Sequence, residues 1–114
     1  MLILFIYFMS CLFNSLSYFL NQDSYSIRQQ ICDYLENNNK IMEDIDTTII
    51  LNLENNDYIT TMRNTSTWGG AIEIQTACNI WNLKIIVKNI RDINGADIEF
   101  IPIHNNFLTT IYLE

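Results

Sequence analysis

The stretch that most constrains the fold runs from Leu12 to Leu20, where apolar side chains recur at intervals of three and four residues. The apolar positions are Leu12, Phe13, Leu16, Phe19 and Leu20. This spacing puts them on one face of an α-helix, and burial of that face would fix the helix against the rest of the protein. We therefore expect a buried helix that begins at Cys11.

Cys11 stands at the expected amino end of this helix. The N–H groups of a first helical turn have no partner within the helix, and the helix dipole is positive there. Helix N-termini and basic neighbours can lower a cysteine pKa from about 8.5 to roughly 3.5–7.5, which is typical of a nucleophile. The competing interpretation is an inert thiol, because free cysteine often packs as a small hydrophobic residue.

A second helix is expected to start near Ser24 or Ser26, where Ser26 and Gln29 have the spacing of a capping box, and the three asparagines at residues 37–39 are expected to end it. Its apolar face predicts which side chains point inward and which point to solvent. The inward set is Ile27, Ile31, Tyr34 and Leu35, with Cys32 beside it, and the outward set is Arg28, Gln29, Asp33 and Glu36.

Residues 41–63 give a mixed signal. Residues 47–51 fit either a strand or the middle of a helix, and residues 58–62 suggest a short helix. The segment is acidic, and no histidine lies near its carboxylates in the sequence. We interpret these acidic residues as a solvated surface.

The tripeptide Trp68-Gly69-Gly70 follows a polar loop. Two consecutive glycines permit positive φ angles and a close approach of the backbone to a neighbour. A third amphipathic helix is expected to begin at Ala71 and to end at Asn82. Its apolar face would carry Ala71, Ile74, Ala77, Cys78 and Trp81, while Glu73 and Gln75 face elsewhere.

The remainder of the chain predicts three strands. Residues 83–87, 98–103 and 109–113 are rich in β-branched side chains, and a turn is expected at residues 92–95. His104 falls in the loop before the last of these strands.

Composition limits the possible partners and the compartment. The chain has 114 residues, which suits one domain, and its net charge of −7 argues against binding to a nucleic-acid backbone but is compatible with a basic protein. Cys11, Cys32 and Cys78 form no disulfide pattern, and one histidine makes a zinc site improbable. These features favour a reducing, cytoplasmic location.

Residues 1–9 are apolar throughout, but no basic residue precedes them as in a signal peptide, and the run is too short to span a bilayer. We expect a buried segment that leads into the Cys11 helix, and therefore no membrane partner. The alternative is a peripheral protein that residues 1–9 anchor to a membrane.

Two blocks together resemble the OTU (ovarian tumour) family of cysteine proteases. They are Cys11-Leu12-Phe13 and Trp-Gly-Gly-Ala-Ile-Glu-Ile-Gln-Thr-Ala at residues 68–77, followed by the isoleucine-rich strand at residues 85–87. The resemblance implies a single OTU-like domain over residues 1–114, with an α+β fold in which helices flank a small central sheet. It further implies a thiol protease, or deubiquitinase, that cleaves isopeptide bonds to ubiquitin or a ubiquitin-like modifier and needs no metal or cofactor.

The resemblance also assigns site residues. Cys11 takes the place of the nucleophile, and the backbone N–H groups of Phe8, Met9 and Ser10 fall where the family binds the oxyanion. Trp68, Gly69 and Gly70 take the place of a loop beside the substrate channel, where they line the channel or serve as scaffold.

The chain departs from the family pattern at two places. Phe8 stands where the family usually has aspartate, and Met9 stands where glycine is common. The family's general-base histidine follows the strand that residues 109–113 resemble, and the sequence ends at Glu114, before that position. We interpret His104 as an ordinary loop histidine. The alternative function is therefore a catalytically inactive OTU-fold module that binds ubiquitin, or an incomplete fragment.

Overall fold

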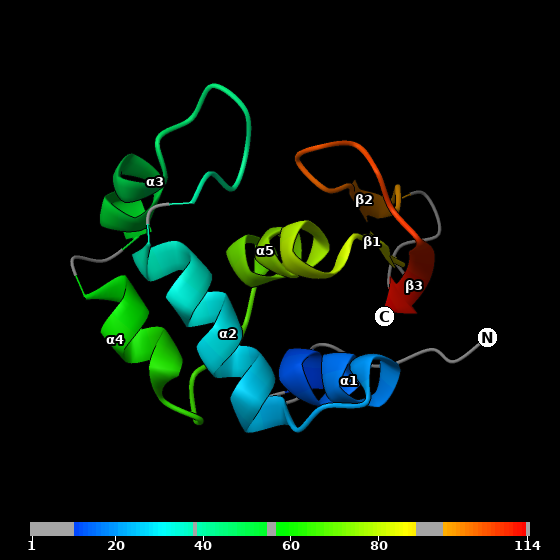
Figure 1. Ribbon diagram of the computed structural model, residues 1–114, viewed down its shortest axis with the longest axis horizontal. Helices are drawn as coiled ribbons and strands as arrows, with labels where there is room; N and C mark the ends of the chain where they lie inside the picture. Colours follow the sequence, from blue (N-terminus) through cyan, green and yellow to red (C-terminus); the bar gives the residue numbers. More distant parts are fainter. Residues whose placement is uncertain (1–10, 38, 55–56, 89–94, 114) are drawn as a thin grey trace.

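The computed structural model describes residues 11–37, 39–54, 57–88 and 95–113. Within these residues, five helices precede three strands (Figure 1). The helices are α1 (Cys11–Leu20), α2 (Ser24–Glu36), α3 (Thr47–Glu54), α4 (Tyr58–Arg63) and α5 (Ala71–Trp81), and the strands are β1 (Leu83–Val87), β2 (Ile98–Phe100) and β3 (Thr109–Leu113). The predicted α+β class is confirmed.

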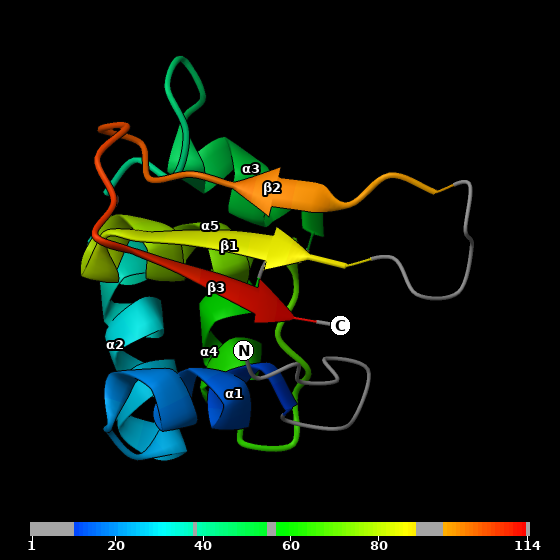
Figure 2. The same ribbon diagram turned by 90° about the vertical axis from the view of Figure 1, so that its right-hand side faces the viewer.

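The three strands form one sheet in the order β2-β1-β3. β2 runs antiparallel to β1, whereas β3 runs parallel to β1, with Ile85 opposite both Phe100 and Ile111. Alternate side chains of the central and parallel strands, such as Ile85 and Ile111, are buried, and α5 packs beside β1 and β2 (Figure 2). Because successive side chains of a strand point to opposite faces of the sheet, the buried side chains share one face, and this face is directed toward α5.

β2 is shorter than the predicted strand at residues 98–103, because it ends at Phe100. Side chains of α5 take the next backbone groups: Gln75 Nε2 donates to the Ile101 carbonyl at 2.7 Å, and the Ile103 N–H donates to Asn79 Oδ1 at 2.8 Å. Pro102 lies between them and has no N–H to give to a sheet. The chain therefore leaves the sheet and bonds to the helix.

The helical core confirms most of the predicted inner faces, although Tyr34 is only partly buried and Ala71 is exposed. Leu12, Phe13 and Leu16 of α1 are buried against the rest of the core, as are Ile27, Ile31, Leu35 and Cys32 of α2. The predicted capping box at Ser26 and Gln29 is wrong, because Asp23 caps α2 through its Oδ1, which accepts from the Ser26 N–H at 3.0 Å.

Residues 47–51, which fitted either a strand or a helix, form most of α3. An aspartate explains the start of this helix, since Asp46 Oδ1 accepts from the Thr48 N–H at 2.8 Å. Thr47 and Leu51 are its buried side chains. No helix in the described ranges is long and apolar enough to cross a membrane.

Candidate active site

Cys11 is the first residue of α1. The next two side chains, Leu12 and Phe13, are almost completely buried, so the first turn of this helix is held against the core from one side. Phe8, Met9 and Ser10, whose backbone was expected to bind the oxyanion, lie outside the described residues.

Gly69 packs directly against this first turn. A Cβ at Gly69 would lie 2.6 Å from Leu12 Cδ2 and 3.0 Å from Phe13 Cε2. The expected close approach of the backbone is therefore present. The glycines do not use the positive φ angles that their residue type permits: no glycine in the described residues has a positive φ, and Gly70 is extended with φ −139° and ψ −153°.

Trp68 precedes this contact and is 54 % exposed. It lies in the loop that leads into α5. Figure 2 shows the amino ends of α1 and α5 on the same side of the molecule as the carboxyl ends of β1 and β3. Trp68 is therefore available to a ligand on the side where Cys11 opens α1.

Arg28 was expected to point outward, but it is only 2 % exposed. Its guanidinium carbon lies 3.9 Å from the centre of the Phe13 ring, a cation–π contact with α1. Its Nη1 donates to the Met62 carbonyl at 2.8 Å and its Nη2 donates to the Thr65 carbonyl at 3.3 Å. Arg28 therefore joins α1 to the segment that leads to Trp68.

Burial lowers the pKa of Arg28 below its ordinary value, while the nearby Cys32 and Glu73 act to raise it. An arginine side chain nevertheless keeps its charge in proteins. The interior beneath α1 therefore holds a permanent cation.

Glu73 was expected to face away from the core, yet it is completely buried. Its Oε1 accepts from the Gly70 N–H at 2.7 Å, and its Oε2 accepts from the Tyr58 hydroxyl at 2.6 Å. In a capping box, the side chain of the third helical residue accepts a hydrogen bond from the backbone N–H of the cap residue. The bond between Glu73 and Gly70 is of this kind, and because it uses only the backbone of the cap residue, a glycine can form it. Burial raises the pKa of the Glu73 carboxyl, and the bonds from Tyr58 and Gly70 and the charge of Arg28 oppose that rise.

The raised pKa of Glu73 predicts a pH dependence of stability. The folded state holds the Glu73 proton at a pH where the unfolded chain has lost it, so this group adds stability as the pH falls toward 4.5, the ordinary pKa of glutamate. Glu73→Gln cannot titrate and can still bond to Gly70 and Tyr58. We expect the wild-type unfolding free energy, measured relative to this variant in urea, to increase from pH 7.5 to pH 5. If the unfolding free energies of the wild type and of Glu73→Gln changed equally with pH, Glu73 would not have a raised pKa in the folded protein.

Cys32 and Cys78 are buried and chemically different from a nucleophile. Burial raises the pKa of the Cys32 thiol to about 11 and that of the Cys78 thiol to about 12. The Cys78 thiol also donates to the Phe100 carbonyl at 3.6 Å. In the parts of the chain that the structure describes, no three histidine, cysteine, aspartate or glutamate side chains gather where they could hold a metal ion.

These pKa values predict the reactivity of both thiols. In native protein at pH 7.5, iodoacetamide should leave Cys32 and Cys78 unmodified, because both are inaccessible and almost fully protonated. Peptide mapping by mass spectrometry measures this directly, and the same reaction in urea is the control that should modify both. Rapid modification of either thiol before unfolding would show that the core opens.

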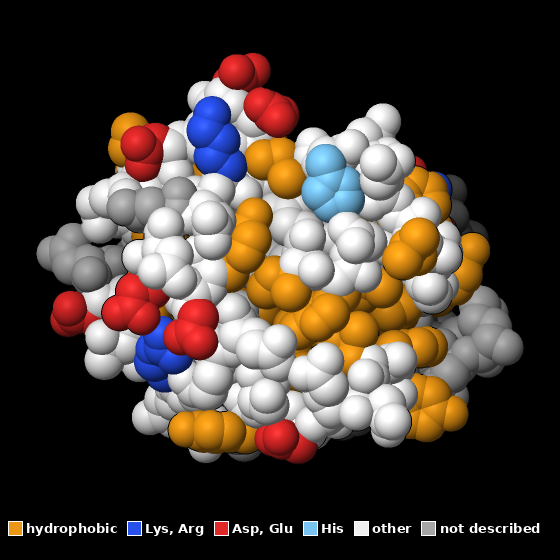
Figure 3. All heavy atoms as spheres, viewed as in Figure 1, with side chains coloured by type: hydrophobic (Ala, Val, Ile, Leu, Met, Phe, Trp, Pro, Cys, Tyr) orange, Lys and Arg blue, Asp and Glu red, His pale blue; other side chains and the backbone are white. Residues whose placement is uncertain are grey.

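His104 lies in the loop between β2 and β3, where its Nδ1 accepts from the Asn106 N–H at 3.3 Å. The same loop bonds to the carboxyl end of α5, since the Leu108 N–H donates to the Asn82 carbonyl. Gly69 lies at the amino end of that helix, roughly 16 Å away at 1.5 Å per residue. The only histidine, pale blue in Figure 3, is therefore not brought to the start of α1.

A family model described as OTU-like cysteine protease matches residues 10–110. The matched range includes Cys11, the whole block at residues 68–77 and the first two strands. No curated protein and no solved structure matches the chain.

Proposed function

We propose, because this chain belongs to the OTU-like cysteine protease family, that it cleaves isopeptide bonds to ubiquitin or a ubiquitin-like modifier. The observation that carries the proposal is the position of Cys11 as the first residue of α1, next to two buried side chains. The free N–H groups and the dipole of a helix amino end stabilise a thiolate. Cys11 is therefore the proposed nucleophile.

In the proposed reaction, the Cys11 thiolate attacks the carbonyl carbon of the isopeptide bond and the carbonyl electrons move to its oxygen. The backbone N–H groups of Phe8, Met9 and Ser10 are the proposed donors to this oxyanion. When the oxyanion collapses, the carbon–nitrogen bond breaks and the lysine nitrogen leaves with an added proton. Water then hydrolyses the thioester and releases the carboxylate and the thiol.

The loop before α5 has two proposed roles. The exposed Trp68 is suited to contact the extended tail of the modifier, whereas Gly69 acts as scaffold, because its backbone packs on Leu12 and Phe13. Gly70 precedes α5, and a Cβ there would meet Glu73 Oε1 at 3.9 Å, an ordinary van der Waals contact. An acidic chain also suits a tail that carries basic residues.

The leaving lysine nitrogen needs a proton donor. The resemblance implies that this donor is a histidine after the strand that corresponds to β3. The carboxyl end of β3 and the amino end of α1 lie on the same side of the molecule (Figure 2), which supports that position. His104 lies at the other end of α5 and is not the proposed base.

The experiment is labelling with ubiquitin that carries an electrophile at its C-terminus. This reaction needs a thiolate but no protonation of a leaving amine, so it tests Cys11 separately from the base. We expect an adduct on Cys11, mapped by mass spectrometry, that disappears in Cys11→Ser. An adduct on Cys32 or Cys78, or no adduct, would contradict the proposal.

The second candidate function is an inactive module that binds ubiquitin. The position of His104, remote from the start of α1, favours it. Ubiquitin binding that survives Cys11→Ala, combined with no labelling and no cleavage by the wild type, would identify this function.

A further inference from the structure

Glu73 is the buried link between α4 and the loop before α5. Its Oε2 accepts from the Tyr58 hydroxyl at 2.6 Å, and its Oε1 accepts from the Gly70 N–H at 2.7 Å. One carboxylate thus joins a side chain of α4 to the backbone of the loop. Glu73 is completely buried and Tyr58 is partly buried, so water competes weakly for these two bonds.

A second bond connects the same helix to this loop. Thr61 lies three residues after Tyr58 in α4, and its carbonyl accepts from the Thr67 hydroxyl at 2.7 Å. Thr67 directly precedes Trp68, whereas Gly70 follows it by two residues. The backbone on both sides of Trp68 is therefore fixed to α4, although the Trp68 side chain itself is 54 % exposed.

Gly69 connects the loop to the first turn of α1. It packs so closely on Leu12 and Phe13 that an added Cβ would lie 2.6 Å from Leu12 Cδ2. Leu12 directly follows Cys11 in α1. A displacement of Gly70 would move Gly69 as well, and the turn that contains Cys11 would lose its neighbour or be pushed aside.

The Tyr58 bond determines which way the Glu73 carboxylate faces. The charge of Arg28 also attracts this carboxylate, but a charge acts without a fixed direction, whereas the Tyr58 hydroxyl donates along one line to Oε2. Without the hydroxyl, the carboxylate could turn away from Gly70 toward another donor, because an unpaired buried carboxylate oxygen is costly. The position of Gly70 therefore depends on Tyr58.

We propose that α4 positions Cys11 for bond cleavage, with Tyr58 as the residue that holds the loop before α5 through Glu73 and Gly70. This inference rests on the proposed function. Tyr58 acts through other residues and is not assigned a contact with the reacting atoms, so it is a positioning residue.

The test compares the labelling of Cys11 by two reagents in the full chain. Ubiquitin with a C-terminal electrophile reacts only when its tail and the thiol are aligned, whereas iodoacetamide reports the reactivity of the thiol alone. Tyr58→Phe removes one hydroxyl and keeps the ring. We expect it to slow labelling by the ubiquitin electrophile about tenfold and to change the iodoacetamide rate by less than about twofold.

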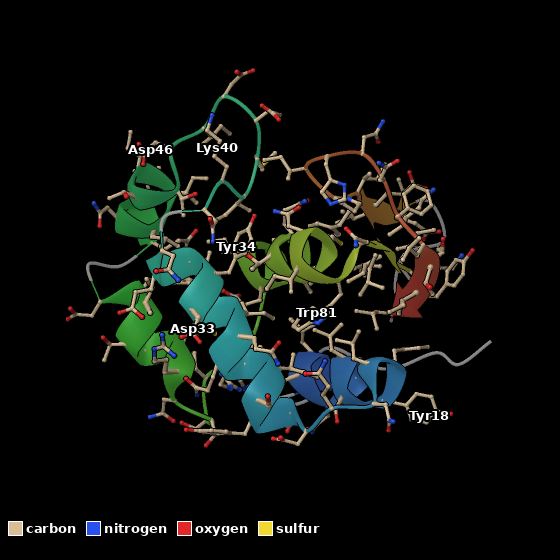
Figure 4. All side chains as sticks on the ribbon, viewed as in Figure 1. Tyr18, Asp33, Tyr34, Lys40, Asp46 and Trp81 are labelled. Atoms are coloured by element: carbon tan, nitrogen blue, oxygen red, sulfur yellow. The ribbon has the colours of Figure 1, made fainter. Side chains whose placement is uncertain are left out.

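Tyr34→Phe is the matched control, because it also removes a bonded hydroxyl from a partly buried tyrosine. The Tyr34 hydroxyl donates to the Lys40 carbonyl at 2.7 Å and accepts from Asn79 Nδ2 at 3.3 Å. In Figure 4, Tyr34 lies at the end of α2 that is remote from α1. This variant should react with both reagents as the parent does, and urea unfolding shows how much stability each variant loses.

Thr67→Val tests the other bond from α4 in a chain that keeps Tyr58. Valine has the shape of threonine but no hydroxyl, so the bond to the Thr61 carbonyl is lost. We expect slower labelling by the ubiquitin electrophile, again with little change in the iodoacetamide rate. If Tyr58→Phe does not fold, Thr67→Val decides alone, and labelling equal to that of the parent would overturn the inference.

Three other results would overturn the inference: a folded Tyr58→Phe variant that is labelled at the parent rate, an equal slowing with both reagents, or an equal effect of Tyr34→Phe. Equal slowing with both reagents would mean that the thiol itself had changed. In all three cases the parent chain is still labelled, so the proposed function stands. If the ubiquitin electrophile never labels Cys11 in the parent chain, the proposed function fails, and the inference fails with it.

Discussion

Replacing Arg28 by alanine is expected to lower the free energy of unfolding by about 3 kcal/mol or more. The substitution removes the donors of two carbonyls, those of Met62 and Thr65, and the buried Met62 group would lose its bond in a site without water access. It also removes the cation from the Phe13 ring and leaves a cavity beneath α1. Urea unfolding measures the loss.

Arg63→Ala is the matched control, because it removes the same side chain from a partly exposed position. Arg63 pairs with Asp33 and Glu36, whose side chains are exposed, so salt and water screen both interactions. We expect a loss of about 1 kcal/mol or less, which decreases further in high salt. Equal losses in the two variants would show that Arg28 contributes no more than a surface arginine.

The variant Arg28→Lys tests whether Arg28 positions the first turn of α1, where Cys11 lies, or only stabilises the core. Lysine keeps the charge but has no planar fork to bond to both carbonyls while it stacks on Phe13. Under conditions where the variant is folded, we expect slower labelling of Cys11 by the ubiquitin electrophile, because the first turn of α1 loses a constraint. A folded variant with an unchanged labelling rate would mean that Arg28 only stabilises the core.

The local pattern of the sequence was sufficient to predict most of the elements. The apolar spacing after Cys11 predicted α1, and the β-branched runs predicted β1 and β3 with their observed limits. Each of these signals comes from neighbouring residues, so no distant contact is needed to interpret it. Residues 47–51 stayed ambiguous because a short apolar run fits either structure.

Arg28 and Glu73 were assigned to the wrong side because their partners are distant in the sequence. The carbonyl that Arg28 binds belongs to Met62, and Glu73 binds Tyr58. A helical wheel contains one usable signal: at 100° per residue, Arg28 falls within the arc between Ile27 and Cys32, which are both buried. A charged residue inside an apolar arc is expected to be buried and to have a polar partner. Residue type alone predicts the opposite, that the charged side chain points to solvent.

The end of β2 shows the same limitation. Its side chains continue the β-branched pattern to Ile103, but Gln75 and Asn79 of α5 bond to the backbone at Ile101 and Ile103. Side chains of α5 thus determine where β2 ends. The sequence of β2 and its neighbours alone does not contain this information.

Gly69→Ala is expected to destabilise the protein by about 1–3 kcal/mol, as an added methyl group does in a packed core. The new Cβ would lie 2.6 Å from Leu12 Cδ2 and 3.0–3.1 Å from the Phe13 ring. Leu12 could turn its methyl group away, but the Phe13 ring is held by the guanidinium of Arg28. The loop and the first turn of α1 must therefore move apart.

Gly70→Ala is the control one residue further on. Its Cβ would meet only Glu73 Oε1, at 3.9 Å, and its φ of −139° suits any residue. We expect a loss of about 1 kcal/mol or less, because alanine is a poorer N-cap than glycine but meets no close neighbour here. The pair also separates close packing from backbone freedom, since both variants lose a glycine but only Gly69→Ala brings its Cβ closer to a neighbour than ordinary van der Waals contact.

The same pair tests whether this contact positions Cys11. Displacement of a nucleophile by about 1 Å can cost roughly 100-fold in rate, so a shift of the first turn should slow the labelling of Cys11 far more than it lowers stability. We expect folded Gly69→Ala to react with the ubiquitin electrophile at least about tenfold more slowly than Gly70→Ala. Equal labelling rates, despite the expected difference in stability, would mean that the Trp68-Gly69-Gly70 loop supports the fold without setting the position of the thiol.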